Sequence, residues 1–165
     1  MISGEEDMQV KFVIVTLTGL AVIGALAERA TVSAQQEPAT TTAAVQARSQ
    51  WDGVFTEEQA KRGADLYAKT CASCHGPELA GSDKGAPLVG SAFDGLYDGK
   101  KMGDLSERIR TTMPVDNPGG LTRAQNADIL AFMLQKAGAP AGQANLPTNV
   151  DQLNAIKYVG KKPGA

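Results

Sequence analysis

All cysteines and the single histidine of this 165-residue chain lie within five consecutive residues, Cys71-Ala72-Ser73-Cys74-His75. This C-x-x-C-H spacing is typical of the attachment of a c-type haem. One turn of chain presents two thiols to the two vinyl groups on one edge of a porphyrin, and the adjacent imidazole reaches the iron from one face. The pattern therefore predicts one covalently bound haem c, attached through Cys71 and Cys74, with His75 as the proximal iron ligand.

Three other chemistries of the same five residues have to be weighed. Structural zinc takes four nitrogen or sulfur ligands, and this chain has three, which are too close together to surround a tetrahedral ion. A thioredoxin-like dithiol belongs in a βαβ pattern, which the sequence lacks. A disulfide across two intervening residues is strained and leaves His75 unexplained. The haem interpretation is the one that uses all three side chains.

A second axial ligand can be sought by elimination. There is no second histidine, so a methionine thioether is the natural candidate. Three methionines lie beyond the N-terminal segment. Met133 falls in a well-patterned helix, where a methionine commonly fills gaps in a core, and Met102 follows a polar loop. Met113 stands between a short helix and Pro114, where a rigid ligand loop is expected, so Met113 is favoured, while Met102 and a vacant sixth position stay open.

The elements that must position these residues are helical. Thr56 and Gln59 have the spacing of a capping box, and apolar or small residues then recur on one helical stripe that reaches Cys71. Nine glycines and prolines between residues 76 and 103 predict loops. Residues 104–111 have the composition of a short helix.

A last long helix is predicted to begin after Thr122, which forms a second capping box with Gln125, and to close at Gly138. One further turn is predicted at residues 151–157. No strand pattern is visible.

The motif and the two long helices resemble the monohaem class I c-type cytochromes of bacteria, over residues 63–134. The resemblance implies an all-α fold of three to four helices and glycine-rich loops around one covalent haem. It also implies that Gly63 and Tyr67 pack against the last helix, whose family positions are occupied by Ile129 and Phe132.

The resemblance implies two further contacts to the haem site. Pro87-Leu88 resembles the segment whose proline carbonyl accepts a hydrogen bond from the proximal histidine, here His75. Thr112-Met113-Pro114 resembles the distal-ligand motif, with Met113 as the sixth ligand. Residues 51–54 and 113–120 look like the bacterial branch that serves quinoprotein dehydrogenases or respiratory oxidases.

The N-terminus carries an export pattern. Residues 12–27 form an apolar run of signal-peptide length, followed by Val32-Ser33-Ala34, which is similar to a cleavage site. We expect a signal peptide over residues 1–34, with translation starting at Met8, a flexible linker at 35–50, a haem domain at 51–138 and a C-terminal extension at 139–165. The alternative is an uncleaved membrane anchor facing the periplasm.

The net charge of the chain restricts the classes of partner that we expect. The formal charge is −2, without the basic excess that nucleic acid demands, so no nucleic-acid partner is expected. Short cationic clusters, Lys100-Lys101 and Arg108 with Arg110, either contact haem propionates or are solvated surface. Tyr97 could likewise reach a propionate or pack on the ring.

With histidine and methionine both on the iron, single-electron transfer is the expected function. We expect a non-enzymatic periplasmic carrier that takes electrons from a dehydrogenase and passes them towards a terminal oxidase. The alternatives are a haem subunit of a larger dehydrogenase or oxidase complex, and a haem enzyme or small-ligand sensor with an open iron position.

Overall fold

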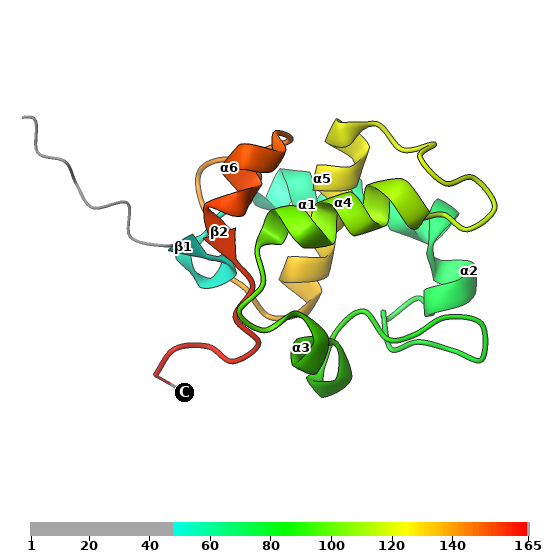
Figure 1. Cartoon of the computed structure of the whole chain (residues 1–165), viewed down its shortest axis with the longest axis horizontal. Helices are drawn as coiled ribbons and strands as arrows, with labels where there is room; N and C mark the ends of the chain where they lie inside the picture. Colours follow the sequence, from blue (N-terminus) through cyan, green and yellow to red (C-terminus); the bar gives the residue numbers. More distant parts are fainter. Residues whose placement is uncertain (1–47, 165) are drawn as a thin grey trace, which may run out of the picture. The chain divides into compact units, whose positions relative to one another are not determined.

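The computed structural model describes residues 48–164, so the predicted signal peptide and most of the predicted linker lie outside the described residues. Six α-helices, one 3-10 helix and two short strands follow one another (Figure 1). In chain order these elements are β1 (Arg48–Ser49), η1 (Gln50–Asp52), α1 (Glu57–Thr70), α2 (Ala72–His75), α3 (Ser91–Tyr97), α4 (Met102–Thr112), α5 (Arg123–Lys136), α6 (Val150–Asn154) and β2 (Ile156–Lys157). None of these helices has the length and apolar character needed to cross a membrane.

Both long helices begin as their capping residues predict. The Thr56 side chain accepts a hydrogen bond from the Gln59 amide at 3.1 Å, and Thr122 forms a complete capping box with Gln125. The first box is incomplete, because the Gln59 side chain bonds instead to both backbone groups of Leu146. Gln59 therefore ties the C-terminal segment to the start of α1.

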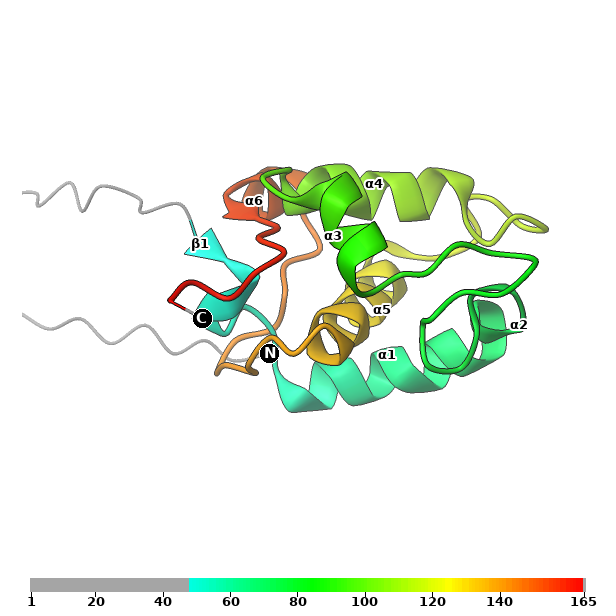
Figure 2. The same cartoon turned by 90° about the horizontal axis from the view of Figure 1, so that it is seen from below.

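The packing of α1 against α5 is the main helix contact. Gly63 lies at the crossing, where an added Cβ would overlap the carbonyl oxygen of Asp128 and approach the Phe132 Cβ to 2.9 Å. One turn later, Tyr67 packs against Phe132 with ring centroids 5.4 Å apart. This confirms that Gly63 and Tyr67 pack against the last long helix. Helix α5 also contacts α4, and Figure 2 shows α5 between α1 and α4.

The glycine-rich region contains one helix that its composition did not predict. Residues 91–97 form α3, which buries Phe93. The helix predicted at 104–111 is longer, because α4 starts at Met102, whose side chain is fully buried. The six helices thus exceed the expected three to four, and the additional ones are short.

The C-terminal segment is part of the fold, which corrects two predicted boundaries. Strand β2 pairs in parallel with β1, placing Ile156 opposite Arg48. The Trp51 indole N–H donates to the Val159 carbonyl at 2.8 Å, and the buried Gln50 side chain bonds both backbone groups of Val159. The folded part therefore includes residues 48–50, which were predicted as linker, and the C-terminal residues predicted as an extension. It also contains strands, which no alternation could predict because each has two residues.

Candidate functional site

The Cys-x-x-Cys-His motif begins where α1 ends. Cys71 leaves helical geometry, with φ −126° and ψ −35°, while its N–H still donates to the Tyr67 carbonyl at 2.9 Å. The amides of Cys74 and His75 then both donate to the Cys71 carbonyl, at 3.1 and 3.0 Å. The chain turns at Cys71 into α2, and the three reactive side chains stand on one short hydrogen-bonded unit.

A tyrosine of α1 secures the end of this unit. The hydroxyl of Tyr67 donates to the Gly76 carbonyl, immediately after His75, at 2.7 Å. Burial raises the pKa of Tyr67 to about 12, so the hydroxyl keeps the proton that it donates.

The loop after α2 folds back over the motif. Gly81 donates its N–H to the His75 carbonyl at 2.9 Å, and the Ser82 hydroxyl donates to the Cys74 carbonyl at 2.5 Å. Gly85 lies so close that an added Cβ would be 2.8 Å from the Cys74 carbonyl oxygen and 3.0 Å from the His75 Nδ1. Only glycine fits there without a shift of the loop or of the imidazole.

The His75 ring is held by a backbone carbonyl, but it is not the predicted one. Nδ1 lies 2.7 Å from the carbonyl oxygen of Ala86, so the assignment to Pro87 is wrong by one residue. The peptide that joins Ala86 to Pro87 carries the oxygen of Ala86, and the proline ring confines Ala86 to extended conformations. Pro87 therefore orients the acceptor without providing it.

This bond determines which nitrogen of His75 can bind a metal. A carbonyl oxygen only accepts, so Nδ1 carries the proton, and the lone pair of the neutral ring lies on Nε2. The imidazole is thus in the tautomer that an iron ligand requires.

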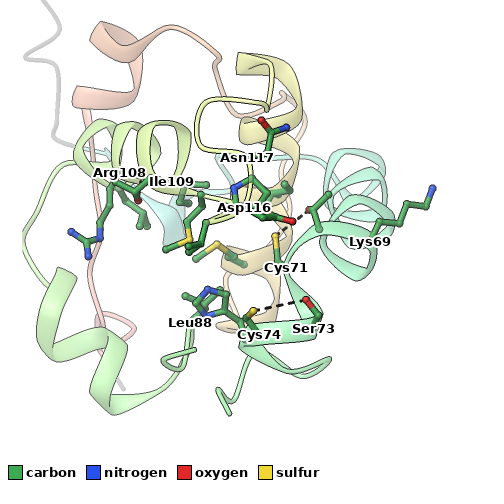
Figure 3. A pocket seen from close by; sticks show the side chains of 18 of the residues that line it. Lys69, Cys71, Ser73, Cys74, Leu88, Arg108, Ile109, Asp116 and Asn117 are labelled. Carbon is green, nitrogen blue, oxygen red and sulfur yellow. Dashed lines mark hydrogen bonds between the residues drawn. The ribbon is translucent and has the colours of Figure 1, made fainter. Parts of the chain in front are cut away.

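The motif opens onto a cavity of about 560 Å³. Its walls come from the end of α1, from α2, α3, α4 and α5, and from residues 113–117 (Figure 3). Cys71, Cys74, His75 and Met113 all line it, so the structure brings together four of the five predicted site residues. The fifth, Pro87, does not line the cavity and follows Ala86, whose carbonyl bonds to His75.

The two cysteines are free thiols, and Figure 3 shows them on the same side of the cavity. Burial raises the pKa of the Cys71 thiol above its ordinary value. Dithiol redox motifs depend on a lowered thiol pKa, so the environment of Cys71 is the opposite of what such a motif needs.

The three candidate methionines differ in where they lie relative to the cavity. Met113 is the C-cap of α4, in extended geometry, and it lines the cavity. Met102 is fully buried at the start of α4 and is not among the lining residues, which removes it as a candidate. Met133 is buried in α5, as predicted for a core residue, and it also contributes to the cavity wall.

These residues fit a haem. The cavity volume of about 560 Å³ is within the roughly 300–1,000 Å³ usual for cofactor sites. Its walls include Leu88, Phe93 and Ile129, which can pack on a porphyrin. Two free thiols, an imidazole with Nε2 available and a methionine share this space, and these are the groups that a c-type haem uses. Their bonds to haem remain a prediction.

Comparison with known families supports the same conclusion. Residues 58–133 match the family model described as cytochrome c oxidase, cbb3-type, subunit III. These residues form a c-type cytochrome domain. The match confirms the predicted family and the all-α fold class, and such a domain works by haem-based electron transfer. Searches of curated proteins and of solved structures gave no match.

Three residues of the cytochrome site were missed in the sequence. Gly85, Ala86 and Ser82 act through the backbone or through a hydroxyl bonded to the backbone. The available signal was the cluster of glycines and prolines after His75, which predicts a loop but does not identify the residue that touches the imidazole.

Proposed function

We propose that this chain is a single-electron carrier with one haem c, attached at Cys71 and Cys74 and ligated by His75 and Met113. The observation that carries the proposal is the shared cavity, onto which α2 and the C-terminal end of α4 bring these four side chains. The bound haem would supply an iron that alternates between two oxidation states.

The protein groups have separate tasks in this function. The two cysteines would hold the haem, and the hydrogen bond to the Ala86 carbonyl leaves His75 Nε2 available as an iron ligand. Met113 would be the second iron ligand, and its soft sulfur would raise the reduction potential. Apolar side chains keep bulk water from the ring and disfavour the extra charge of the oxidised form.

Two axial protein ligands distinguish a carrier from a haem enzyme or a gas sensor. If His75 and Met113 both ligate the iron, no coordination position would be left for oxygen or peroxide. Electron transfer then needs only partner proteins that approach the ring edge.

The proposed location and partners rest on the sequence. Cleavage after Ala34 would release the chain into the periplasm, and a membrane association would follow only if that segment stays uncleaved. Removing residues 1–34 takes away two cationic and four anionic side chains, which leaves the mature chain formally neutral. A dehydrogenase would donate electrons, and a terminal oxidase or another cytochrome would accept them.

A second candidate is a subunit of a respiratory oxidase. It is favoured by the family description, which names subunit III of a cbb3-type oxidase. The chemistry of the haem would be the same in both cases, and the difference lies in whether the chain exists free or bound to a membrane complex.

The test is to isolate the protein from the periplasmic fraction and from the membrane fraction, without heating the samples, and to characterise it. We expect a soluble protein whose intact mass equals that of residues 35–165 plus one haem. Its oxidised form should show the weak far-red band of methionine sulfur on ferric haem, and its reduced form should not react with carbon monoxide. A bare polypeptide mass would contradict haem attachment. Rapid carbon monoxide binding would contradict the carrier, and co-purification with oxidase subunits would support the second candidate.

A further inference from the structure

The loop that begins at Met113 has few contacts of its own. It connects α4 to α5 and is the yellow-green segment between these helices in Figure 1. Residues 115–120 are all exposed, and two backbone turn bonds within the loop hold its shape. Among residues 48–164, no side chain of residues 113–121 makes a hydrogen bond or an ion pair. The position of Met113 therefore depends on the helices at the two ends of the loop.

Two links join α4 to α5 at the base of this loop, and the first is an ion pair. The Glu107 carboxylate on α4 accepts a hydrogen bond from Arg123, the first residue of α5, at 3.1 Å. Arg110 donates to the same carboxylate at 2.7 Å. The hydrogen bond from Arg110 is the main reason why the pKa of Glu107 lies below its ordinary value, so the carboxylate is charged at neutral pH.

The second link is a buried hydrogen bond. The Asn126 side-chain amide donates to the Ser106 carbonyl at 3.0 Å and to the Ser106 hydroxyl at 2.7 Å, and both residues are buried. Ser106 is next to Glu107 on α4, and Asn126 is three residues from Arg123, which places both on one face of α5. The two helices are thus tied at two adjacent points, about two turns before the loop begins.

The needs of α5 alone do not explain either side chain that this helix contributes. Asn126 Oδ1 is buried without a hydrogen-bond partner in the described part of the chain, which costs stability. Arg123 lies in the first turn, where the helix dipole favours an anion over a cation, and that turn contains no acidic residue. What Asn126 and Arg123 provide is the connection to α4.

We infer that Glu107 and Asn126 are positioning residues for Met113, an inference that rests on the proposed ligation of iron by this methionine. The Met113 amide bonds to the Ile109 carbonyl, so the backbone of Met113 moves with the last turn of α4. The two links hold that turn at a fixed place relative to α5, which forms another part of the cavity wall. When the links open, the last turn of α4 and the loop can move away from the cavity together with Met113.

The links should act on the release of Met113 more than on global unfolding. A segment with few contacts opens locally, with a free energy far below that of global unfolding. An exposed ion pair contributes little to global stability. The same small contribution is a larger part of the free energy that keeps the loop closed, so loss of a link should mainly accelerate release of the ligand.

The experiment compares Arg123→Gln and Asn126→Leu with Arg62→Gln. Arg62 is a matched control, because its side chain is 51% exposed, against 52% for Arg123, and it pairs at 3.0 Å with Asp128 of the same helix α5. Each holoprotein is mixed with imidazole, and the rate at which the far-red band disappears at saturating imidazole measures the release of Met113. Hydrogen exchange of the Met113 amide and denaturant unfolding are measured on the same proteins.

Arg123→Gln should accelerate release of Met113 and exchange of its amide about two- to fivefold, as expected for loss of an exposed pair. Arg62→Gln should leave both rates unchanged, although it also loses an ion pair. Asn126→Leu should accelerate release on the order of tenfold, as expected for loss of a buried hydrogen bond, while the denaturant midpoint stays the same or rises. If Asn126→Leu does not fold, the surface pair decides the outcome.

Reversal of the ion pair is the rescue experiment. Glu107→Arg alone places a cation beside Arg110 and Arg123 and should accelerate release more than Arg123→Gln does. The double variant Glu107→Arg with Arg123→Glu restores opposite charges across the loop and should return the rate close to that of the parent protein. Equal release rates in Arg123→Gln, Arg62→Gln and the parent protein, or a double variant as fast as Glu107→Arg, would overturn the role of the ion pair. Unchanged release in folded Asn126→Leu would overturn the role of Asn126.

The parent protein separates these outcomes from failure of the proposed function. If it carries one covalent haem and the far-red band, unresponsive variants refute only the positioning role. If it lacks the haem or the band, the proposed ligation by Met113 fails, and the positioning role fails with it.

Discussion

His75 and Met113, the two candidate axial ligands, are held by the fold in different ways. His75 is fixed through its side chain, by the bond from Nδ1 to Ala86 and by the close approach of Gly85. Met113 is fixed through its backbone, whose N–H donates to the Ile109 carbonyl at 2.9 Å. Met113 is therefore the ligand that should exchange more readily.

Replacement of Met113 by Ala should remove the sulfur ligand without affecting haem attachment. We expect the reduction potential to fall by tenths of a volt, within the range of about 0.8 V that axial ligands span. Carbon monoxide should bind the reduced form, and the far-red band should disappear. Redox titration and absorption spectra measure all three effects.

Two other methionines serve as controls for this variant. Met102→Ala should lower the free energy of unfolding by about 2–5 kcal/mol, as expected for a buried methionine, and should keep the far-red band. Met133→Leu keeps an apolar side chain on the cavity wall and should also keep the band. Loss of the band in Met133→Leu but not in Met113→Ala would assign the ligand to Met133.

Ionisation of the Tyr67 hydroxyl makes the free energy of unfolding depend on pH. Its pKa rises from 10.0 to about 12 in the folded protein, mainly through burial. Between these pH values the folded state keeps a proton that the unfolded chain has lost, so stability falls as the pH rises. The full stability of the fold with respect to Tyr67 is therefore present at pH values below 10.0, the pKa of the tyrosine in the unfolded chain.

The Tyr67→Phe variant should lose the bond to Gly76 and this alkaline effect together. At neutral pH we expect the free energy of unfolding to drop by about 1 kcal/mol. The further drop on moving to about pH 11 should be smaller than in the parent protein. Denaturant titrations at both pH values measure these changes, and an equal alkaline drop in the two proteins would contradict the assignment to Tyr67.

At the scale of elements, the crossing of α1 and α5 positions the site. Helix α1 ends in the cysteine motif, and α5 contributes Ile129 and Met133 to the cavity wall. The backbones approach closely at Gly63 because it has no side chain. The distance between these helices therefore helps to set the width of the cavity.

Gly63→Ala should destabilise the protein. Alanine is better than glycine in a helix by about 1 kcal/mol. Overlap with the Asp128 carbonyl acts in the opposite direction, and forcing atoms into a packed interface costs about 1–3 kcal/mol or more. We expect a net loss of on the order of 1–2 kcal/mol, measured by thermal or denaturant unfolding.

Gly95→Ala is the matched control within α3, because a Cβ there meets nothing within 4 Å. This variant should be neutral or more stable by up to about 1 kcal/mol. A Gly63→Ala protein as stable as the Gly95→Ala protein would show that the helix crossing adjusts without cost.

At the scale of the whole molecule, the cavity separates parts of the protein core. It has a volume of about 560 Å³, and exposed residues such as Arg108 and Val115 stand on its walls, so without a ligand it is open to solvent. Apolar side chains of α3, α4 and α5 would then face water, and they would lose the stabilisation that burial gives. A bound porphyrin would fill the space with apolar surface.

The double variant Cys71→Ala and Cys74→Ala, purified without haem, should therefore lose its specific tertiary packing. We expect retained helical circular dichroism, a weakened near-ultraviolet signal and binding of a hydrophobic dye. A sharp thermal transition matching that of the holoprotein would contradict a structural role for haem.

The sequence by itself determined the motif, both long helices and the all-α fold class. These features are local: the five-residue spacing, the capping residues Thr56 and Thr122, and the 3.6-residue stripe each depend on neighbours within a few turns. Their prediction needed no knowledge of distant contacts.

Only the tertiary structure decided the Ala86 acceptor, the exclusion of Met102, helix α3 and the pairing of β1 with β2. In each case the partner is distant in the sequence or is a backbone group. Backbone carbonyls are identical in every residue, so composition cannot say which one reaches His75. A two-residue strand has no period to detect, and it exists because the C-terminal segment returns to pack beside residues 48–51.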